Sequence, residues 1–199
     1  MKSMWNERYS SEEYIYGTKP NKFFAEQISK LEPGKVLFLG EGEGRNAMHA
    51  AKLGWDVDAV DYSEAGKLKA LKLAEQENVN LNYMVGDVTK FDFEENNFDA
   101  AVIIYLHLNE KDRNKVHKNV IDILKPNGKI ILEVFEKSQI KNDTGGPKNI
   151  DLLYSLEDIF EDFQDLDIIK FSNETIHLNE GDLHNGTASV IQYVGEKKH

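Results

Sequence analysis

The distribution of apolar and polar positions along the 199-residue chain predicts strands that alternate with helices. Short apolar runs, rich in large or β-branched residues as buried parallel strands require, occur at 35–39, 55–60, 81–85, 98–104 and 129–135. Between them, apolar residues recur three or four positions apart, which is typical of helices packed on a sheet. The alternation predicts an α/β fold with a doubly wound parallel sheet and right-handed crossovers.

Helix start signals divide the chain further. Pro20 and Asn21 precede one helical pattern, Ser63 precedes another, and Ser155 with Asp158 forms a capping-box pattern before a third. Strand-like runs at 167–171 and 188–194 complete the chain, and the loop at 137–151 is long enough to indicate a functional cover.

We therefore expect one domain over residues 1–199, built from three parts. Residues 1–34 form an N-terminal cap segment and helix, 35–136 form a ligand-binding core, and 137–199 form a cover loop, a helix and a C-terminal hairpin. The longest apolar run, 100–106, is too short to span a bilayer, and the N-terminus has no apolar signal core. These features predict a cytoplasmic protein.

The amino-acid composition excludes several kinds of bond, metal site and reaction mechanism. The chain has no cysteine, which excludes disulfides, thiolate zinc sites and a cysteine nucleophile. A net charge of −11 argues against nucleic acid as the main partner. No compact acidic cluster suggests a metal ion, so we expect none, and both a monomer and a homodimer stay open.

The first strand breaks into a glycine turn that opens a helix. Gly40, Gly42 and Gly44 stand at alternate positions, where they allow a sharp turn and close approach of a ligand. Arg45 and Asn46 follow at the helix start and are suited to hold a ligand carboxylate. The alternatives are a plain tight turn and a surface arginine.

Acidic residues end the next two strands. Asp61 lies about twenty residues after the glycines, where its carboxylate can accept both ribose hydroxyls. Asp87 can accept a hydrogen bond from the exocyclic amine of an adenine, and the Tyr62 ring can stack on the face of that adenine. The neighbours Ser63, Gly86 and Val88 belong to the same strand ends. Each feature alone is explained by a helix cap or a turn, but jointly they favour a nucleoside ligand.

A dinucleotide fingerprint would place its third glycine where Arg45 stands. The Gly-x-Gly-x-Gly spacing, Asp61 and Gly86-Asp87 instead resemble motifs of class I S-adenosylmethionine-dependent methyltransferases. The chain is similar, more specifically, to a small bacterial group related to the tellurite-resistance and thiopurine methyltransferases. The matching segments are 16–21, 40–47, 60–63, 107–108, 145–148, 180–181 and 184–186.

This resemblance implies a Rossmann-like seven-stranded sheet whose last strand is antiparallel, with helices on both faces and S-adenosyl-L-methionine as cofactor. One departure concerns Phe38, which stands where many class I enzymes carry an acidic residue. We expect Glu41 to take over that role and to face the amino or sulfonium end of the ligand.

Aromatic faces suit a sulfonium cation, so four tyrosines are candidates for the site. Tyr16 and Tyr105 are expected at the cofactor, with Tyr16 favoured by its motif, and Tyr9 and Tyr14 at the substrate. The alternative is that these side chains simply pin the N-terminal segment to the core.

His107 ends the most apolar strand and is the candidate general base, with a structural role as the alternative. Lys148, His177 and His184 are further substrate-side candidates. A thiolate or chalcogen anion would need no base, because it is already nucleophilic.

The sequence thus predicts methyl transfer from S-adenosylmethionine to a small molecule, such as a thiol or chalcogen species. A second hypothesis is a cofactor-binding sensor or partner module without catalysis. A third, a nicotinamide-dependent oxidoreductase, is disfavoured by Arg45 at the third-glycine position.

Overall fold

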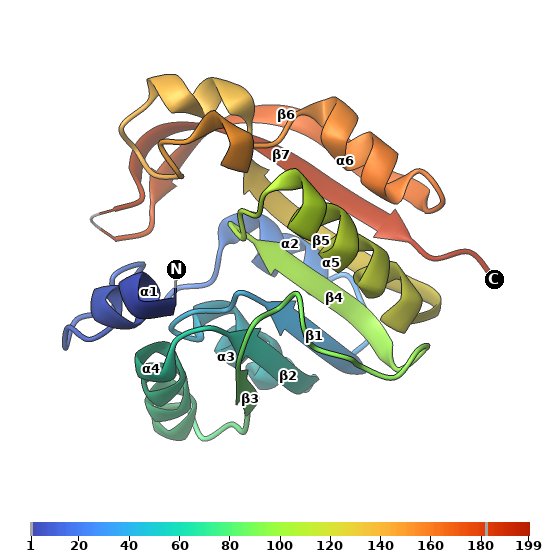
Figure 1. Ribbon diagram of the computed structural model, residues 1–199. Coiled ribbons are helices and arrows are strands. Elements are labelled where there is room, and N and C mark those ends of the chain that lie inside the picture. The colour runs from blue at the N-terminus through green and yellow to red at the C-terminus, as the bar shows by residue number, and fades with distance from the viewer. Residues whose placement is uncertain (1, 182) are drawn as a thin grey trace.

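The computed structural model describes residues 2–181 and 183–199, and its strands form one seven-stranded sheet of order β3-β2-β1-β4-β5-β7-β6 (Figure 1). The strands are β1 (Lys35–Leu39), β2 (Asp56–Asp61), β3 (Asn82–Val85), β4 (Phe98–Ile104), β5 (Leu124–Phe135), β6 (Asp167–Asn179) and β7 (Asn185–Glu196). The first five pair in parallel, and β7 is antiparallel to both β5 and β6. The predicted Rossmann-like sheet with an antiparallel last strand is confirmed.

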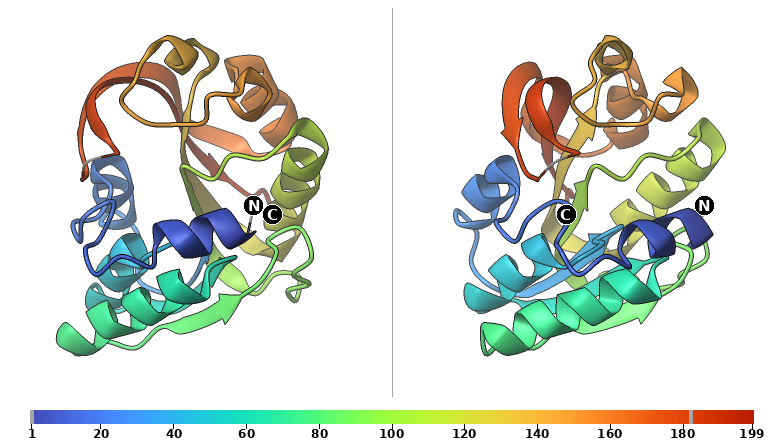
Figure 2. Two further views of the ribbon diagram at one scale, coloured as in Figure 1. Left: turned by 60° about the vertical axis from the view of Figure 1, so that its left-hand side comes forward. Right: turned by 90° about the vertical axis from the view of Figure 1, so that its left-hand side faces the viewer.

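Helices cover both faces of this sheet (Figure 2). They are α1 (Lys2–Arg8), α2 (Lys22–Ile28), α3 (Arg45–Lys52), α4 (Glu64–Gln76), α5 (Glu110–Ile123) and α6 (Leu156–Phe163), with short 3-10 helices at Lys137–Lys141 and Ile150–Leu152. Side chains alternate along β1, so that Leu37 joins the core under α5 and α6, whereas Phe38 joins the core under α2, α3 and α4. None of the helices in the described part of the chain is long and apolar enough to cross a membrane.

Side-chain caps start the helices where local sequence indicated. Ser63 accepts a hydrogen bond from the Gly66 amide at the start of α4. Ser155 and Asp158 form the expected capping box of α6. These short-range hydrogen bonds confirm that the helix starts were readable from the sequence.

Two segments differ from the prediction. Residues 2–8 form α1, a helix that was not predicted within the N-terminal cap segment. The C-terminal hairpin is much longer than predicted, because β6 and β7 pair from Asp167 and Glu196 to the tip at Asn179 and Asn185. Polar residues on the exposed face of β6 hid its full length, since an edge strand needs apolar residues on one face only.

Candidate active site

The glycine turn lies at the carboxyl end of β1, between β2 and β4. Strand order reverses here, which is where doubly wound sheets bind ligands. Gly40, Gly42 and Gly44 have φ of 72°, 64° and 88°, a region that favours glycine. A Cβ at Gly42 would lie 2.6 Å from the Tyr9 hydroxyl, so the N-terminal segment covers this turn directly.

Glu41 caps the helix that follows the turn. Its Oε1 accepts hydrogen bonds from the amides of Asn46 (2.9 Å) and Ala47 (2.8 Å). Burial raises the pKa of Glu41 to about 7, although these two amides and Arg45 oppose the shift. The expectation that the N-terminus of α3 faces a ligand carboxylate is therefore wrong for these two amides, because Glu41 already occupies them.

Asp61 points from the end of β2 toward the glycine turn. Its Oδ2 accepts from the Gly42 amide (3.1 Å) and its Oδ1 from the Ser63 amide (2.9 Å). Burial raises its pKa to about 6, with the amide hydrogen bonds opposing. Ser63 itself is fully buried and serves as the cap of α4, so its hydroxyl is not free for a ligand.

The turn after β3 is tied together locally. Asp87 Oδ1 accepts from the amide (3.0 Å) and hydroxyl (2.7 Å) of Thr89, and the Tyr62 hydroxyl also bonds Asp87. Burial acts to raise the pKa of Asp87, but these bonds outweigh it and lower the pKa to about 2. The Val88 side chain packs in the core, and Gly86 is packed against Phe91. Contacts of this turn with an adenine stay a prediction.

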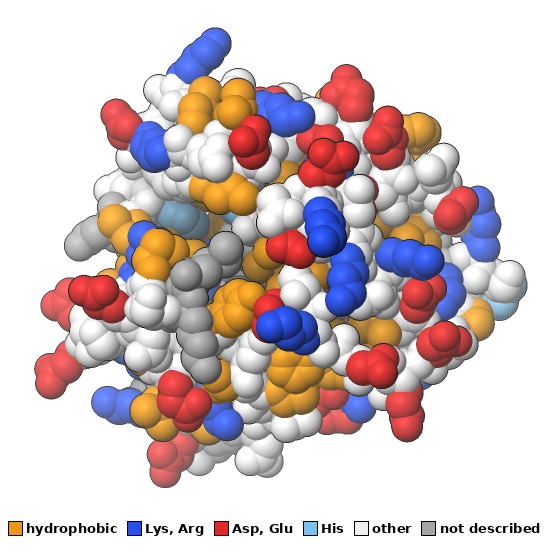
Figure 3. Space-filling view, viewed as in Figure 1, with side chains coloured by type: hydrophobic (Ala, Val, Ile, Leu, Met, Phe, Trp, Pro, Cys, Tyr) orange, Lys and Arg blue, Asp and Glu red, His pale blue; other side chains and the backbone are white. Residues whose placement is uncertain are grey.

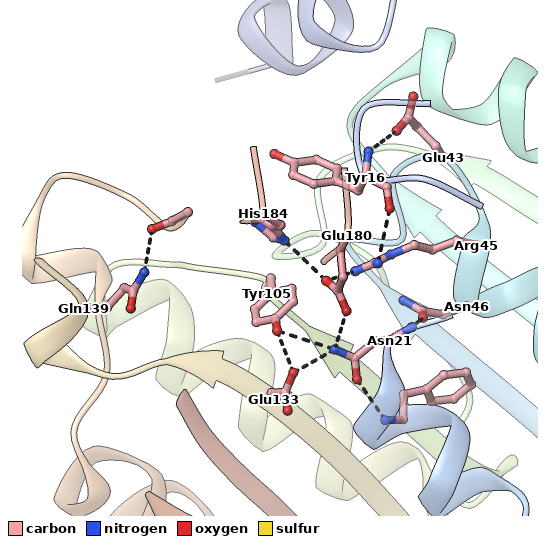
Figure 4. Close-up of polar contacts among 12 residues, drawn as sticks. Tyr16, Asn21, Glu43, Arg45, Asn46, Tyr105, Glu133, Gln139, Glu180 and His184 are labelled. Carbon is pink, nitrogen blue, oxygen red and sulfur yellow. Dashed lines mark hydrogen bonds and ion pairs between the residues drawn. The ribbon is translucent and has the colours of Figure 1, made fainter. Parts of the chain in front are cut away.

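Arg45 and Asn46 bind other parts of the chain. Arg45 donates from Nη2 to Glu180 Oε2 (2.8 Å) and from Nη1 to the Tyr16 carbonyl (3.3 Å), and Asn46 Oδ1 accepts from the Asn21 amide (2.8 Å) (Figure 4). Their predicted role as carboxylate ligands is not supported, because the helix after the glycine turn uses these side chains to hold the hairpin tip and the N-terminal linker.

Glu133, which sequence reasoning did not single out, lies at the centre of this region with 1% of its surface exposed. Its Oε1 accepts from Asn21 Nδ2 (2.7 Å) and the Tyr105 hydroxyl (2.6 Å), and its Oε2 accepts from Gln192 Nε2 (2.6 Å). Tyr105 has φ of 55°, which is uncommon for a residue with a side chain and frequent at functional sites. In the sequence, the sign that could have drawn attention to Glu133 was its acidic side chain inside the apolar run 129–135.

Four aromatic rings gather beside these polar groups, and Figure 4 shows three of them, those of Tyr16, Tyr105 and His184. The His184 ring lies 4.5 Å from that of Tyr16, 4.9 Å from that of Tyr105 and 5.4 Å from that of Phe135, between centroids. The loop at 142–149 packs on them, since a Cβ at Gly145 would lie 2.7 Å from His184. In the space-filling view a histidine lies in a recess between the upper and lower halves of the molecule (Figure 3).

Comparison with known proteins agrees with this geometry. Residues 36–128, from β1 to the turn inside β5, match the model of the methyltransferase domain family. The match covers a little under half of the chain. The resemblance to class I S-adenosylmethionine-dependent methyltransferases is confirmed, and S-adenosyl-L-methionine is the cofactor that the family implies.

Two curated methyltransferases and one crystal structure illustrate the similarity. The chain is 24% identical over 155 residues to the probable S-adenosyl-L-methionine-dependent methyltransferase TehB of Haemophilus influenzae, covering 77% of this chain and 51% of the relative. It is 31% identical over 101 residues to a demethylmenaquinone methyltransferase of Paenarthrobacter aurescens, covering 51% and 38%. The crystal structure of H. influenzae TehB superposes with a TM-score of 0.76 at 19% identity, covering 99% of this chain and 67% of the other. The chain spans about half the length of the curated TehB and 38% of the length of the demethylmenaquinone methyltransferase.

The residues at the glycine turn fit this cofactor. In the described part of the chain, Glu41 Oε2 has no hydrogen-bond partner, and burial raises the pKa values of both Glu41 and Asp61. One carboxyl group with a free oxygen, and a second whose oxygens accept only from backbone amides among the described residues, suit a ligand that brings an ammonium group and ribose hydroxyls.

The contacts of His107 favour the structural role that was the alternative to a general base. Its Nδ1 lies 2.7 Å from the Leu152 carbonyl and its Nε2 accepts from the Phe135 amide (3.3 Å), so both ring nitrogens bind backbone. Burial lowers the pKa of His107 to about 4. His107 therefore ties β5 to the cover loop, and its role as a general base stays a prediction that these contacts disfavour.

Three substrate-side candidates lie apart from the aromatic rings. The Tyr14 hydroxyl donates to the Lys69 carbonyl (3.1 Å), which fastens the N-terminal segment to α4. Lys148 is exposed and pairs with Asp143, and His177 is exposed on β6. Of the predicted residues, the structure brings together Tyr16, Tyr105 and His184, while Tyr9 is buried against the glycine turn.

Among residues 2–181 and 183–199, no group of three or more histidine or carboxylate side chains is arranged to hold a metal ion.

Proposed function

We propose that this protein transfers the methyl group of S-adenosylmethionine to a small-molecule acceptor, such as a thiol or a chalcogen species. The observation that carries the proposal is the pair of carboxyl groups whose pKa values are raised by burial, Glu41 and Asp61, beside the glycine turn at the switch point of the sheet. We further propose that it acts in the cytoplasm, as a monomer or homodimer, and not on nucleic acid.

In this proposal Asp61 accepts the ribose hydroxyls, and the free Oε2 of Glu41 accepts the ammonium group. When bound, the cofactor supplies an activated methyl group on a sulfonium cation. Methyl transfer from a sulfonium needs alignment and exclusion of water more than covalent help. In this proposal the rings of Tyr16 and Tyr105, which both lie against the His184 ring, face the sulfonium cation and help to exclude water.

His184 replaces His107 as the candidate base for a neutral acceptor. Its Nδ1 lies 3.4 Å from Glu180 Oε2, which leaves Nε2 as the nitrogen that can take a proton. Burial lowers the pKa of His184, although Glu180 opposes this, so the ring is neutral and able to accept. A thiolate or chalcogen anion would need only orientation at the same place. The similarity to the tellurite-resistance group supports that acceptor class.

Two measurements test the proposal. Calorimetry with S-adenosylmethionine and NAD comes first, and binding of NAD alone would refute the proposal in favour of an oxidoreductase. A methyl-transfer screen then counts release of S-adenosylhomocysteine across thiols, selenite, tellurite, small acids and amines. Tight cofactor binding without turnover on any of these acceptors would favour the sensor or partner module.

A further inference from the structure

A buried charged cluster lies between the glycine-turn helix and the hairpin tip, and consists of Asn21, Arg45, Glu133, Glu180 and His184 (Figure 4). Arg45 and His184 are 7% and 6% exposed, Glu133 is 1% exposed, and the Glu180 side chain is 13% exposed. Asn21 Nδ2 bridges the two carboxylates, at 2.7 Å from Glu133 and 3.3 Å from Glu180. The cluster is thus one hydrogen-bonded unit.

The two carboxyl groups of the cluster differ in how their charge is compensated. Burial raises the pKa of Glu133, although its hydrogen-bond donors oppose the shift. Burial also acts to raise the pKa of Glu180, but His184 and Arg45 outweigh it and lower that pKa. Glu133 accepts from three neutral donors and Glu180 accepts from Arg45 and Asn21, with His184 Nδ1 at 3.4 Å. A carboxylate with several donors is stabilised in its charged form. The His184 ring is neutral because burial lowers its pKa.

When Glu133 is ionised, the guanidinium of Arg45 faces two carboxylates, which leaves an excess of one negative charge in the cluster. In the described chain, Glu180 pairs with Arg45 and His184, and Glu133 has no ion pair. Arg8 donates to the Tyr16 hydroxyl, and its charge helps to lower the pKa of His184. Uncompensated charge in a buried place is costly, and a cation bound nearby would offset that cost.

The cluster adjoins the place where the cofactor is expected. Arg45 begins α3 directly after the glycine turn, and Tyr105, which donates to Glu133, directly follows β4. Since β1 and β4 are neighbours in the sheet, the cluster borders the switch point from the β4 side.

We propose that the excess negative charge of this cluster selects the cationic cofactor over its neutral product, so that Glu133 and Glu180 favour binding of S-adenosylmethionine relative to S-adenosylhomocysteine. This inference rests on the proposed function. The two ligands differ in one methyl group and one positive charge, so their affinity ratio reports the charge with little contribution from shape.

The test is calorimetry of both ligands with the full chain and with Glu133→Gln, which keeps the shape of the side chain and removes its charge. We expect the affinity for S-adenosylmethionine to fall about tenfold, equivalent to about 1.4 kcal/mol, with a less than threefold change for S-adenosylhomocysteine. Glu180→Gln should shift the ratio of the two affinities in the same direction. If Glu133→Gln does not fold, the result for Glu180→Gln decides the question.

Asp99→Asn is the matched control, since it removes one carboxylate with the same change of charge. Asp99 pairs with Lys125 near the start of β4, six residues before Tyr105 and therefore roughly 20 Å from it along the strand. The affinity ratio of this variant should equal that of the unmodified chain. Thermal unfolding without ligand confirms that each variant is folded.

The outcomes separate the two claims. If the unmodified chain binds neither ligand, the proposed function fails. If it binds both, and the glutamine variants weaken both ligands equally or leave the ratio unchanged, the cluster is a structural tie and the inference is overturned.

Discussion

Glu41 makes the stability of the ligand-free protein depend on pH in a direction opposite to that of an ordinary salt-bridged carboxylate. Burial raises its pKa from an ordinary 4.5 to about 7 in the folded state. Between these values the folded protein binds more protons than the unfolded chain, so the free energy of unfolding falls as pH rises from 4.5 to 7. Glu41 therefore destabilises the fold above pH 7.

The size of the effect follows from the shift. A change from 4.5 to about 7 corresponds to about 3 kcal/mol as an upper limit. Glu41 keeps some contact with solvent, which screens part of the charge, so we expect about 1–3 kcal/mol. Glu41→Gln removes the titration and keeps the cap, because the amide oxygen can still accept from Asn46 and Ala47.

The assay is urea unfolding followed by circular dichroism at pH 5 and pH 8 without ligand. Glu41→Gln should be more stable than the unmodified chain at pH 8, by about 1–3 kcal/mol, and much closer to it at pH 5. Glu77→Gln, at an exposed pair with Lys52, controls for the loss of one surface charge. A stability difference between the Glu41 variant and the unmodified chain that is the same at both pH values would refute the reasoning.

Three further predictions concern the site. Gly44→Ala should lower the free energy of unfolding by about 1–3 kcal/mol more than Gly54→Ala does, measured by thermal unfolding. Both glycines have positive φ, but the new methyl group lies 2.5 Å from an α4 side chain at Gly44 and 4.0 Å from its nearest neighbour at Gly54. Equal losses of stability would contradict the packing argument. His107→Ala should lower the melting temperature and leave the affinity for the cofactor near normal. His184→Ala should lower turnover on a neutral acceptor, with a smaller loss of stability. The reverse pattern would restore His107 as the base. Asp61→Ala should abolish S-adenosylmethionine binding by calorimetry, and unchanged affinity would show that the ribose contact lies elsewhere.

The predictions from sequence succeeded where physical causes act between near neighbours or along one element. The continuous burial of the apolar run on β1, the cap at Ser63 and the capping box at Ser155 each depend on residues a few positions apart. The positive φ of Gly40, Gly42 and Gly44 follows from the turn they form. The parallel pairing of the first five strands likewise followed from the general rule for strands that alternate with helices.

The roles of individual side chains were decided by contacts between distant parts of the chain. His107 and His184 are both histidines after strands, yet one is fixed by two backbone groups and the other lies among aromatic rings.

The sequence by itself therefore determined the fold and the resemblance to class I methyltransferases, because these depend on periodicity and local motifs. Only the tertiary structure decided which polar groups satisfy one another. Asn21 meets Glu133 across 112 positions, and Arg45 meets Glu180 across 135. Buried polar groups take whichever partner the packing brings within hydrogen-bond distance, and spacing along the chain carries no record of that choice.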